Sequence, residues 1–298
     1  MINISVTSVS TVGQESGGEG EVLPSFVLYA LIASVLVSFV AGTAGVFAVL
    51  RGVSFLIAGA AHAALGGATI ALILATQTGI PFLPPIVGAL LMALAMALAT
   101  GYAGGRGITA RMETAISVFF ALSLCLAVAA ISLVPSELMS QVWGFLLGDI
   151  LLLTEQDVLI LTVATLVVIS LISIFFKEFT YICFDMEGAA AFGMRVHLYN
   201  YLLLSLIATS TVIATKAIGA IVVYAMMTAP AATALLHAKS IERAIILATA
   251  LSLLYLCTSL LISLTLVNIA PGALAGVLAA VVYLISLTIK RARRRIRE

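Results

Sequence analysis

The chain has 298 residues, of which 63% are hydrophobic and 9% are charged, and its formal net charge is +1. Soluble domains carry about a quarter of their residues as charged side chains, so this composition excludes an ordinary soluble protein. The apolar runs are about 18 to 25 residues long, which is the length that crosses a bilayer as a helix. The alternating pattern of a membrane β-barrel is absent.

The two ends of the chain differ from its middle. Residues 1–22 are polar, acidic and rich in Gly and Ser, which is unlike a cleavable signal peptide. We expect residues 1–22 to form an extracellular segment, residues 23–290 to form a transmembrane domain, and residues 291–298 to form a basic cytoplasmic tail.

Nine apolar segments predict an all-α, polytopic membrane bundle. They are 24–50, 54–77, 84–103, 115–134, 157–176, 198–215, 218–236, 244–267 and 272–289. Several gaps carry Lys or Arg and are expected in the cytoplasm, whereas the gaps 78–83, 135–156 and 268–271 carry neither. This alternation predicts an outside N-terminus, a cytoplasmic C-terminus and about nine crossings. The run 198–236 is the tightest, so eight crossings are expected if one of its two helices is short or re-entrant.

The segment 51–69 places one imidazole, His62, inside an apolar helix rich in small residues. An ionisable side chain within a bilayer is costly unless it faces a protein interior or an aqueous path, which indicates a transport pathway with His62 on its wall. Ala58, His62, Gly66 and Thr69 share one helix face because they are four, four and three residues apart. The alternative is a histidine that hydrogen-bonds a neighbouring helix.

The outer gap 135–156 is apolar in its middle but too short to span, which predicts a helix that lies on, or dips back from, the outer surface. Asp149 and Asp157 lie near its end and would attract cations toward a pathway mouth, although capping a helix start is the expected role of Asp157. Lys216 follows at the turn between two spans, where its stem is expected to reach the outer interface.

The cytoplasmic gap 177–197 contains a helix start signal, Asp185 with Glu187 and a run of alanines, and a stop at Gly193. We predict a short surface helix over 185–193 that a partner protein binds. A solvated connector is the alternative.

Several kinds of chemistry are missing from the sequence. It has no P-loop, no His-Glu-x-x-His and no nucleophile elbow, so an enzymatic activity is not expected. His197 and His237 lie at cytoplasmic borders and are expected to be interface residues. A proton- or sodium-driven carrier usually needs an acidic residue near the midplane, and none is found. A secondary carrier or channel is therefore the second hypothesis.

Several motifs, in the family's order over about residues 25–290, resemble the permease subunits of zinc, manganese and iron ABC importers. They are Ser54-Phe-Leu with His62-Ala and Gly66, Glu113-Thr-Ala-Ile, Phe145-Leu-Leu-Gly-Asp-Ile, Glu155-Gln-Asp157, Phe184-Asp-Met-Glu187 with Ala191-Phe-Gly193, Lys216-Ala-Ile-Gly219, and Thr228-Ala-Pro230-Ala-Ala-Thr233-Ala.

The resemblance implies a homodimer with the architecture of a type II ABC importer. It implies that cytoplasmic P-loop ATPase subunits dock on the 185–193 helix and that an extracellular metal-binding protein delivers a divalent metal ion, which is substrate and not a bound cofactor. No nucleic-acid partner is implied. The residues implied for the metal pathway are His62, Thr69 and Asp149; those for ATPase coupling are Asp185, Glu187, Ala191 and Gly193; and those of a structural motif are Lys216, Gly219 and Pro230.

One position departs from the family pattern. The family usually carries an Asp four residues before the pathway histidine, and this chain has Ala58 there. A lone imidazole binds a divalent cation more weakly than an imidazole–carboxylate pair, although two copies of His62 could face each other across a dimer. The sequence therefore predicts transport of a metal species and leaves the ion open.

Overall fold

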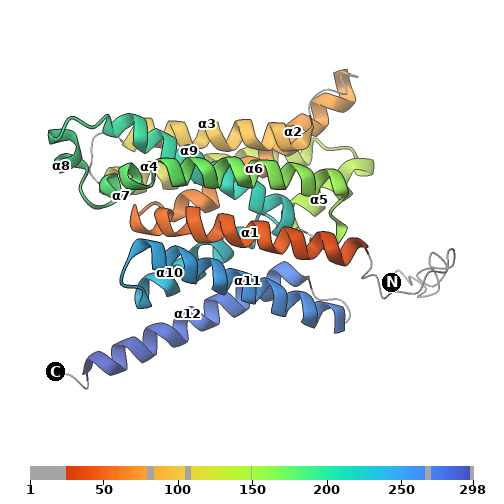
Figure 1. The fold of residues 1–298 in the computed structure, drawn as a ribbon. Helices are drawn as coiled ribbons and strands as arrows, with labels where there is room; N and C mark the ends of the chain where they lie inside the picture. The colour runs from red at the N-terminus through yellow and green to blue at the C-terminus, as the bar shows by residue number, and fades with distance from the viewer. Residues whose placement is uncertain (1–24, 79–83, 105–108, 149, 266–269, 296–298) are drawn as a thin grey trace.

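The computed structural model describes residues 25–78, 84–104, 109–148, 150–265 and 270–295. Within these ranges the regular elements are all helical, and eight helices are long and apolar enough to cross a membrane. The long helices are α1 (Ser25–Leu50), α2 (Phe55–Thr78), α3 (Pro85–Gly104), α4 (Thr109–Ser132), α6 (Glu155–Ile174), α9 (Val196–Ile218), α11 (Ile241–Thr265) and α12 (Pro271–Arg295). The prediction of an all-α membrane bundle is confirmed (Figure 1).

The remaining predicted crossing is the short helix α10 (Val223–His237). Its 15 residues extend about 22 Å at 1.5 Å per residue, which is less than the roughly 30 Å of a hydrocarbon core. The run 198–236 thus forms one full-length helix and one short helix, so the full spans number eight among the described residues.

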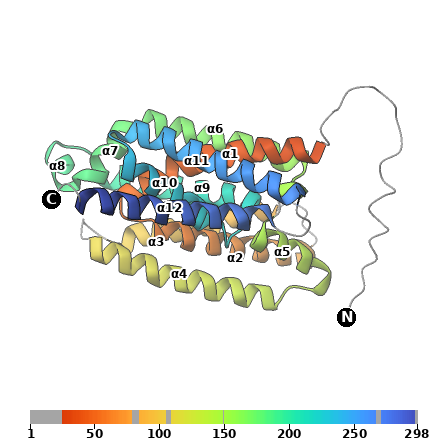
Figure 2. The ribbon, with the colours of Figure 1, turned by 90° about the horizontal axis from the view of Figure 1, so that it is seen from below.

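The elements sort to two ends of the bundle. In two perpendicular views, α8 (Met186–Ala191) and the C-terminal end of α12 lie at one end, while α5 (Met139–Leu147) and the start of α1 lie at the other (Figures 1 and 2). We call these the α8 end and the α5 end. The positive-inside rule assigns the α8 end to the cytoplasm, and that sidedness stays a prediction.

Helices α2 and α9 form the centre of the bundle. In the apolar windows of these helices 83% and 72% of the residues are buried, against 28% in α4 and in α6 and 22% in α12. Small residues permit this packing, because a Cβ on Gly67 of α2 would lie 2.2 Å from the carbonyl oxygen of Gly88 in α3. Close packing of small residues is what holds helices together in lipid.

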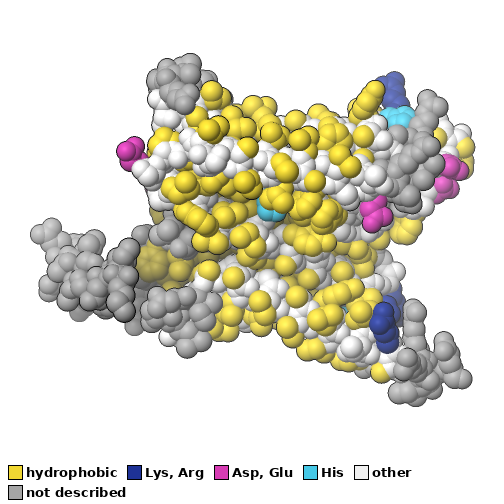
Figure 3. Space-filling view, turned by 180° about the vertical axis from the view of Figure 1, so that it is seen from behind, with side chains coloured by type: hydrophobic (Ala, Val, Ile, Leu, Met, Phe, Trp, Pro, Cys, Tyr) yellow, Lys and Arg dark blue, Asp and Glu magenta, His cyan; other side chains and the backbone are white. Residues whose placement is uncertain are grey.

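The outer helices present an apolar belt. On the face in Figure 3, acidic side chains lie toward both ends and Lys and Arg toward one, and the surface between them is rich in hydrophobic side chains and shows no charged side chain, with one histidine near its middle. Val118, Leu159 and Ile246 are more than 60% exposed and belong to α4, α6 and α11. Exposed apolar side chains of this density fit a protein whose solvent is lipid. The chain is a multi-pass membrane protein.

The short elements partly match the expectations. The outer segment forms α5, flanked by two single-turn 3-10 helices, η2 (Ser136–Leu138) and η3 (Ile150–Leu152), as a non-spanning helix was predicted there. The first part of the predicted gap 177–197 forms a further helix, α7 (Phe176–Phe184), in which Phe179 and Ile182 are buried against the bundle. The segment 1–22 and residues 296–298 of the predicted tail lie outside the described residues.

Candidate functional site

His62 lies near the middle of α2, the most buried of the long helices, and its imidazole is partly exposed. The ring packs against Phe120 of α4, with 5.4 Å between the two ring centroids. The Nδ1 atom is buried and makes no hydrogen bond within the described part of the chain. Buried polar nitrogens are nearly always bonded, so the unpartnered Nδ1 marks His62 as a candidate metal ligand.

The small residues around His62 face two different helices. A Cβ on Gly59 would lie 2.2 Å from Cε of Met96 in α3, whereas a Cβ on Gly66 would lie 3.3 Å from the backbone of Ala127 in α4. Gly66 therefore lets α4 approach beside the imidazole. Ala58, one turn before His62, is buried, so this face of α2 carries no carboxylate next to the ring. Among the described residues, no three His, Cys, Asp or Glu side chains gather to hold a metal ion.

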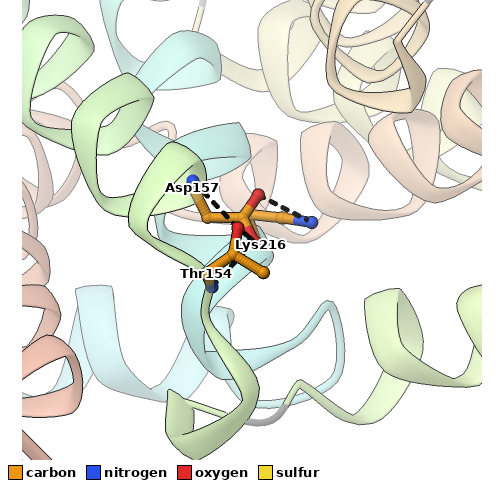
Figure 4. Close-up of polar contacts among 3 residues, drawn as sticks. All are labelled: Thr154, Asp157 and Lys216. Carbon is orange, nitrogen blue, oxygen red and sulfur yellow. Dashed lines mark hydrogen bonds and ion pairs between the residues drawn. The ribbon is translucent and has the colours of Figure 1, made fainter. Parts of the chain in front are cut away.

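A second polar region lies at the α5 end, in a cavity of about 590 Å³. Thr69 of α2, Asp157 of α6 and Lys216 of α9 contribute to its lining. Lys216 Nζ lies 3.3 Å from Asp157 Oδ1, the one ion pair within the described ranges (Figure 4). Lys216 is thus paired with a carboxylate at this cavity, and the expectation that its stem reaches the outer interface stays a prediction.

The start of α6 fixes the Asp157 carboxylate. Thr154 is the N-cap residue, and its hydroxyl accepts a hydrogen bond from the backbone N–H of Asp157. In return, Asp157 Oδ2 accepts hydrogen bonds from the backbone N–H and the hydroxyl of Thr154, at 3.2 Å and 2.9 Å. The expected capping role of Asp157 is confirmed as the reciprocal half of a capping box. Asp149 lies outside the described residues.

Two motifs that are distant in sequence meet behind this cavity. Gly148 after α5 (φ +67°) and Gly219 after α9 (φ +87°) lie backbone to backbone, and a Cβ on Gly148 would be 2.1 Å from the Gly219 nitrogen. The N–H of Ala220 donates to the Phe145 carbonyl at 3.2 Å. In the following helix, Pro230 lies inside α10 and is buried, and its missing N–H removes one bond of that helix.

The α8 end carries the predicted coupling residues. Asp185 caps α8 by accepting a hydrogen bond from the backbone N–H of Gly188 at 2.8 Å, and the helix ends at Ala191. Gly193 follows with φ +80°, and a Cβ placed on it would meet no atom within 4 Å. Glu187 lies in the first turn of the helix. A helix is therefore present within the predicted segment 185–193, over Met186–Ala191, and its role in coupling stays a prediction.

Sequence reasoning missed a polar contact that joins α8 to α2. Arg51, in the turn before α2, donates through Nε to Asn200 Oδ1 of α9 at 3.3 Å and through Nη2 to the sulfur of Met186, the first residue of α8. Burial lowers the pKa of the Arg51 guanidinium and raises the pKa of the nearby Cys183 thiol to about 12. The available signal was that Arg51 and Asn200 are polar residues at the ends of apolar runs.

Comparison with known proteins agrees with this architecture. The model of the ABC 3 transport family matches residues 24–290. The manganese import system permease protein ScaB of Streptococcus gordonii is 34% identical over 269 residues, which cover 90% of this chain and 93% of ScaB. The manganese transport system membrane protein MntC of Listeria monocytogenes is 32% identical over 90% of this chain and 92% of its own length.

A solved structure supports the same assignment. A chain of PsaBC from Streptococcus pneumoniae, determined in complex with Fab, superposes with a TM-score of 0.79 at 31% identity, covering 93% of this chain and 96% of that chain. With the family match spanning most of the sequence, this chain belongs to the ABC 3 transport family.

Proposed function

We propose that this chain is the membrane subunit of an ATP-driven importer of a divalent metal ion, with manganese as the best supported ion. His62 carries the proposal: it is a partly exposed imidazole with an unbonded Nδ1 in the most buried long helix. An imidazole nitrogen in an otherwise apolar surrounding is a metal-competent group on a path through lipid. The curated relatives ScaB and MntC are named as manganese permeases, which supports the choice of ion.

The metal is held only in passing at His62. With Ala58 one turn before it, the imidazole lacks a carboxylate partner, and a single nitrogen ligand binds a divalent cation weakly. We infer that a second copy of the chain brings a second His62 to the pathway, since the partly exposed ring is accessible at the surface of one chain. Weak binding favours release as well as capture.

The α8 end receives the ATPase subunits. A cavity of about 330 Å³ lies between α7 and α8, lined by Tyr181, Phe184 and Phe192 among others, and these three aromatic side chains are 62%, 70% and 90% exposed. An apolar side chain of the ATPase fits such a cavity. Movement of α8 would reach α2 through Met186 and Arg51, because Arg51 precedes the first residue of α2 by only four positions. An extracellular metal-binding protein would deliver the ion at the opposite, α5 end.

The experiment is uptake of Mn²⁺ into proteoliposomes that contain the full-length chain with or without its ATPase. We expect uptake only when the ATPase and ATP are both present, and at least a tenfold loss in His62→Ala. His197→Ala is the matched control, because His197 is an exposed histidine at the start of α9 and should keep wild-type uptake. Uptake by the chain alone would instead establish the carrier or channel hypothesis.

One further variant tests the weak-binding argument. Ala58→Asp places a carboxylate one helical turn from His62, so Mn²⁺ should stimulate the ATPase at a concentration at least tenfold lower than in the wild type. Ala58→Asn, which has nearly the same size but no charge, should not produce this gain. If the two variants respond to the same Mn²⁺ concentration, the hypothesis that His62 binds the metal in the pathway is wrong.

A further inference from the structure

The cavity at the α5 end has a mostly apolar lining that carries five polar side chains and one ion pair. Its polar side chains are Thr69, Gln141, Gln156, Asp157 and Lys216, and they come from α2, α5, α6 and α9. Four of the five offer oxygen atoms, and the fifth is a cation. Oxygen ligands of this kind, completed by water, are those preferred by Mg²⁺, Ca²⁺ and Mn²⁺.

The two oxygens of the Asp157 carboxylate contact different groups. Oδ2 accepts both hydrogen bonds from Thr154 and is committed to the start of α6. Oδ1 faces the Lys216 ammonium, 3.3 Å away (Figure 4). Oδ1 is therefore the atom that a metal cation in the cavity would bind. In this structure the Lys216 ammonium already contacts it.

Lys216 has a second partner within reach. Its Nζ lies 5.4 Å from the centroid of the Phe145 ring on α5, which is within the range of a cation–π contact. The lysine stem is long and flexible, so the ammonium can move from Oδ1 toward the ring without movement of α9. Phe145 itself is held in place, since its carbonyl accepts the hydrogen bond from Ala220.

The end of α9 is also held by contacts other than the ion pair. The backbone contact of Gly148 with Gly219 and the hydrogen bonds of Ala220 and Ile221 to Phe145 and Leu146 already fix the end of α9 against α5. About a quarter of each charged side chain stays exposed, 28% for Lys216 and 23% for Asp157. Ion pairs that keep such contact with solvent contribute little to stability.

We propose that this cavity is the first binding site for the transported divalent cation, and that the Lys216 ammonium is an internal competitor for Asp157 Oδ1. This inference rests on the proposed function. The cation binds Oδ1 with oxygen atoms of Thr69, Gln141 or Gln156 and with water, and the ammonium withdraws to the Phe145 ring. The Thr69 hydroxyl donates to the Leu65 carbonyl at 2.8 Å, so its oxygen lone pairs remain available to a metal.

The position of Thr69 connects this site to His62. Both residues lie on one face of α2, seven positions apart, which corresponds to about 10 Å along the helix axis. A cation released from Asp157 thus has the imidazole as the next ligand on the same helix. The carboxylate that the family pattern leads one to expect at Ala58 is supplied, in this chain, at the outer cavity.

The test measures Mn²⁺ binding by electron paramagnetic resonance to the full-length permease–ATPase complex in nanodiscs without nucleotide. Lys216→Met removes the internal competitor and should lower the dissociation constant for Mn²⁺ at least tenfold. Asp157→Asn keeps an acceptor for Thr154 but removes the charge, and should raise the dissociation constant at least tenfold. Thr69→Val should raise it about threefold. Lys239→Met, which removes an exposed lysine at the opposite end, is the control for net charge.

The signs of these changes decide the outcome. If the ion pair only joins α6 to α9, both single variants lower the melting temperature and both weaken Mn²⁺ binding, and the proposal is overturned. The double variant should bind like Asp157→Asn, because Lys216 acts only through that carboxylate. Binding at the cavity should persist in His62→Ala. Both proposals stand if His62→Ala loses uptake while Lys216→Met still lowers, and Asp157→Asn still raises, the dissociation constant for Mn²⁺. Uptake without ATP refutes the proposed function but not the binding site.

Discussion

The two ends of the bundle use the same backbone device for different purposes. Gly219 at the α5 end and Gly193 at the α8 end both have positive φ angles, +87° and +80°. A Cβ on Gly219 would lie 2.3 Å from the carbonyl carbon of Leu147, whereas a Cβ on Gly193 would meet nothing within 4 Å. Gly219 brings two backbones together, and Gly193 only ends a helix.

The difference fits the roles proposed for the two ends. At the α5 end, close backbone contact fixes Phe145 and Lys216 around a cavity that holds an ion pair. At the α8 end, Phe184 and Phe192 are largely exposed and no described element covers them. Fixed geometry suits a site that must select an ion, and uncovered aromatic side chains suit a surface that a partner protein completes.

Gly219→Ala should have the largest effect, because it disrupts the close backbone contact at the α5 end. The φ and ψ angles of Gly219, +87° and 155°, lie in a region that is open essentially to glycine alone. The added Cβ also collides with Leu147, so we expect destabilisation of about 3 kcal/mol or more, observed as loss of monodisperse protein in detergent.

The matched control for Gly219→Ala is Gly144→Ala in α5. A Cβ on Gly144 meets no atom within 4 Å, and alanine is favoured over glycine inside a helix, so this variant should melt at or slightly above the wild-type temperature. Equal yields and melting temperatures of the two variants would show that the contact with α5 is not a fixed feature of the outer end.

Phe192→Ala should have an intermediate effect, which is a loss of ATPase binding at the α8 end. Phe192 is 90% exposed beside the apolar cavity of α7 and α8, so its removal should leave the melting temperature unchanged. If the ATPase covers this side chain, its affinity for the permease should fall at least tenfold, as for aromatic residues at the centre of interfaces. The measurement is titration of the purified ATPase onto the permease in nanodiscs.

The control for Phe192→Ala is Tyr102→Ala, near the end of α3. Tyr102 is another exposed aromatic residue, 81% exposed, but it does not line the α7–α8 cavity. Its removal should leave ATPase affinity within about twofold of wild type. A similar loss of affinity in both variants would place the ATPase on a wider surface than α7 and α8.

Local signals in the sequence account for the parts that were predicted. Asp185 caps α8 because a carboxylate before a run of alanines satisfies a free N–H, and the short apolar stretch around Phe145 forms α5 because it cannot span. The burial of α2 follows from its small residues. These features depend on residues within a few turns of one another, so the order of residues is sufficient to find them.

The parts that were missed depend on contacts between distant residues. Lys216 pairs with Asp157 only because α9 and α6 lie together, and Arg51 bonds Asn200 across 149 positions of the chain. Helix α7 was not predicted within the gap 177–197, and it is held by packing of Phe179 on Phe47 of α1, with ring centroids 6.0 Å apart. No local motif carries such information, because it is set by which helices become neighbours.

Labelling of Cys183 should disturb the protein least. It measures how reactive a thiol on α7 is, next to the exposed aromatic side chains of the α8 end. Cys183 belongs to α7, one residue before the exposed Phe184, but burial raises the pKa of its thiol from the ordinary 9.0 to about 12. The raised pKa favours the neutral thiol, so the reactive thiolate is rare at every pH below about 12. At pH 8 its fraction is about a thousandfold lower than for an ordinary thiol.

In a background without Cys125 and Cys257, we therefore expect iodoacetamide to label Cys183 more than tenfold more slowly at pH 8 than a cysteine introduced by Lys239→Cys, which lies exposed after α10. The rate should keep rising with pH beyond 10, where the control has levelled off. Arg51→Met should slow labelling further, because the Arg51 cation lowers the pKa of this thiol. Rates within tenfold of the control would mean that solvent reaches the Cys183 thiol. The exposed surface of the α8 end would then extend beyond Phe184 and Phe192 to the side of α7 that carries Cys183.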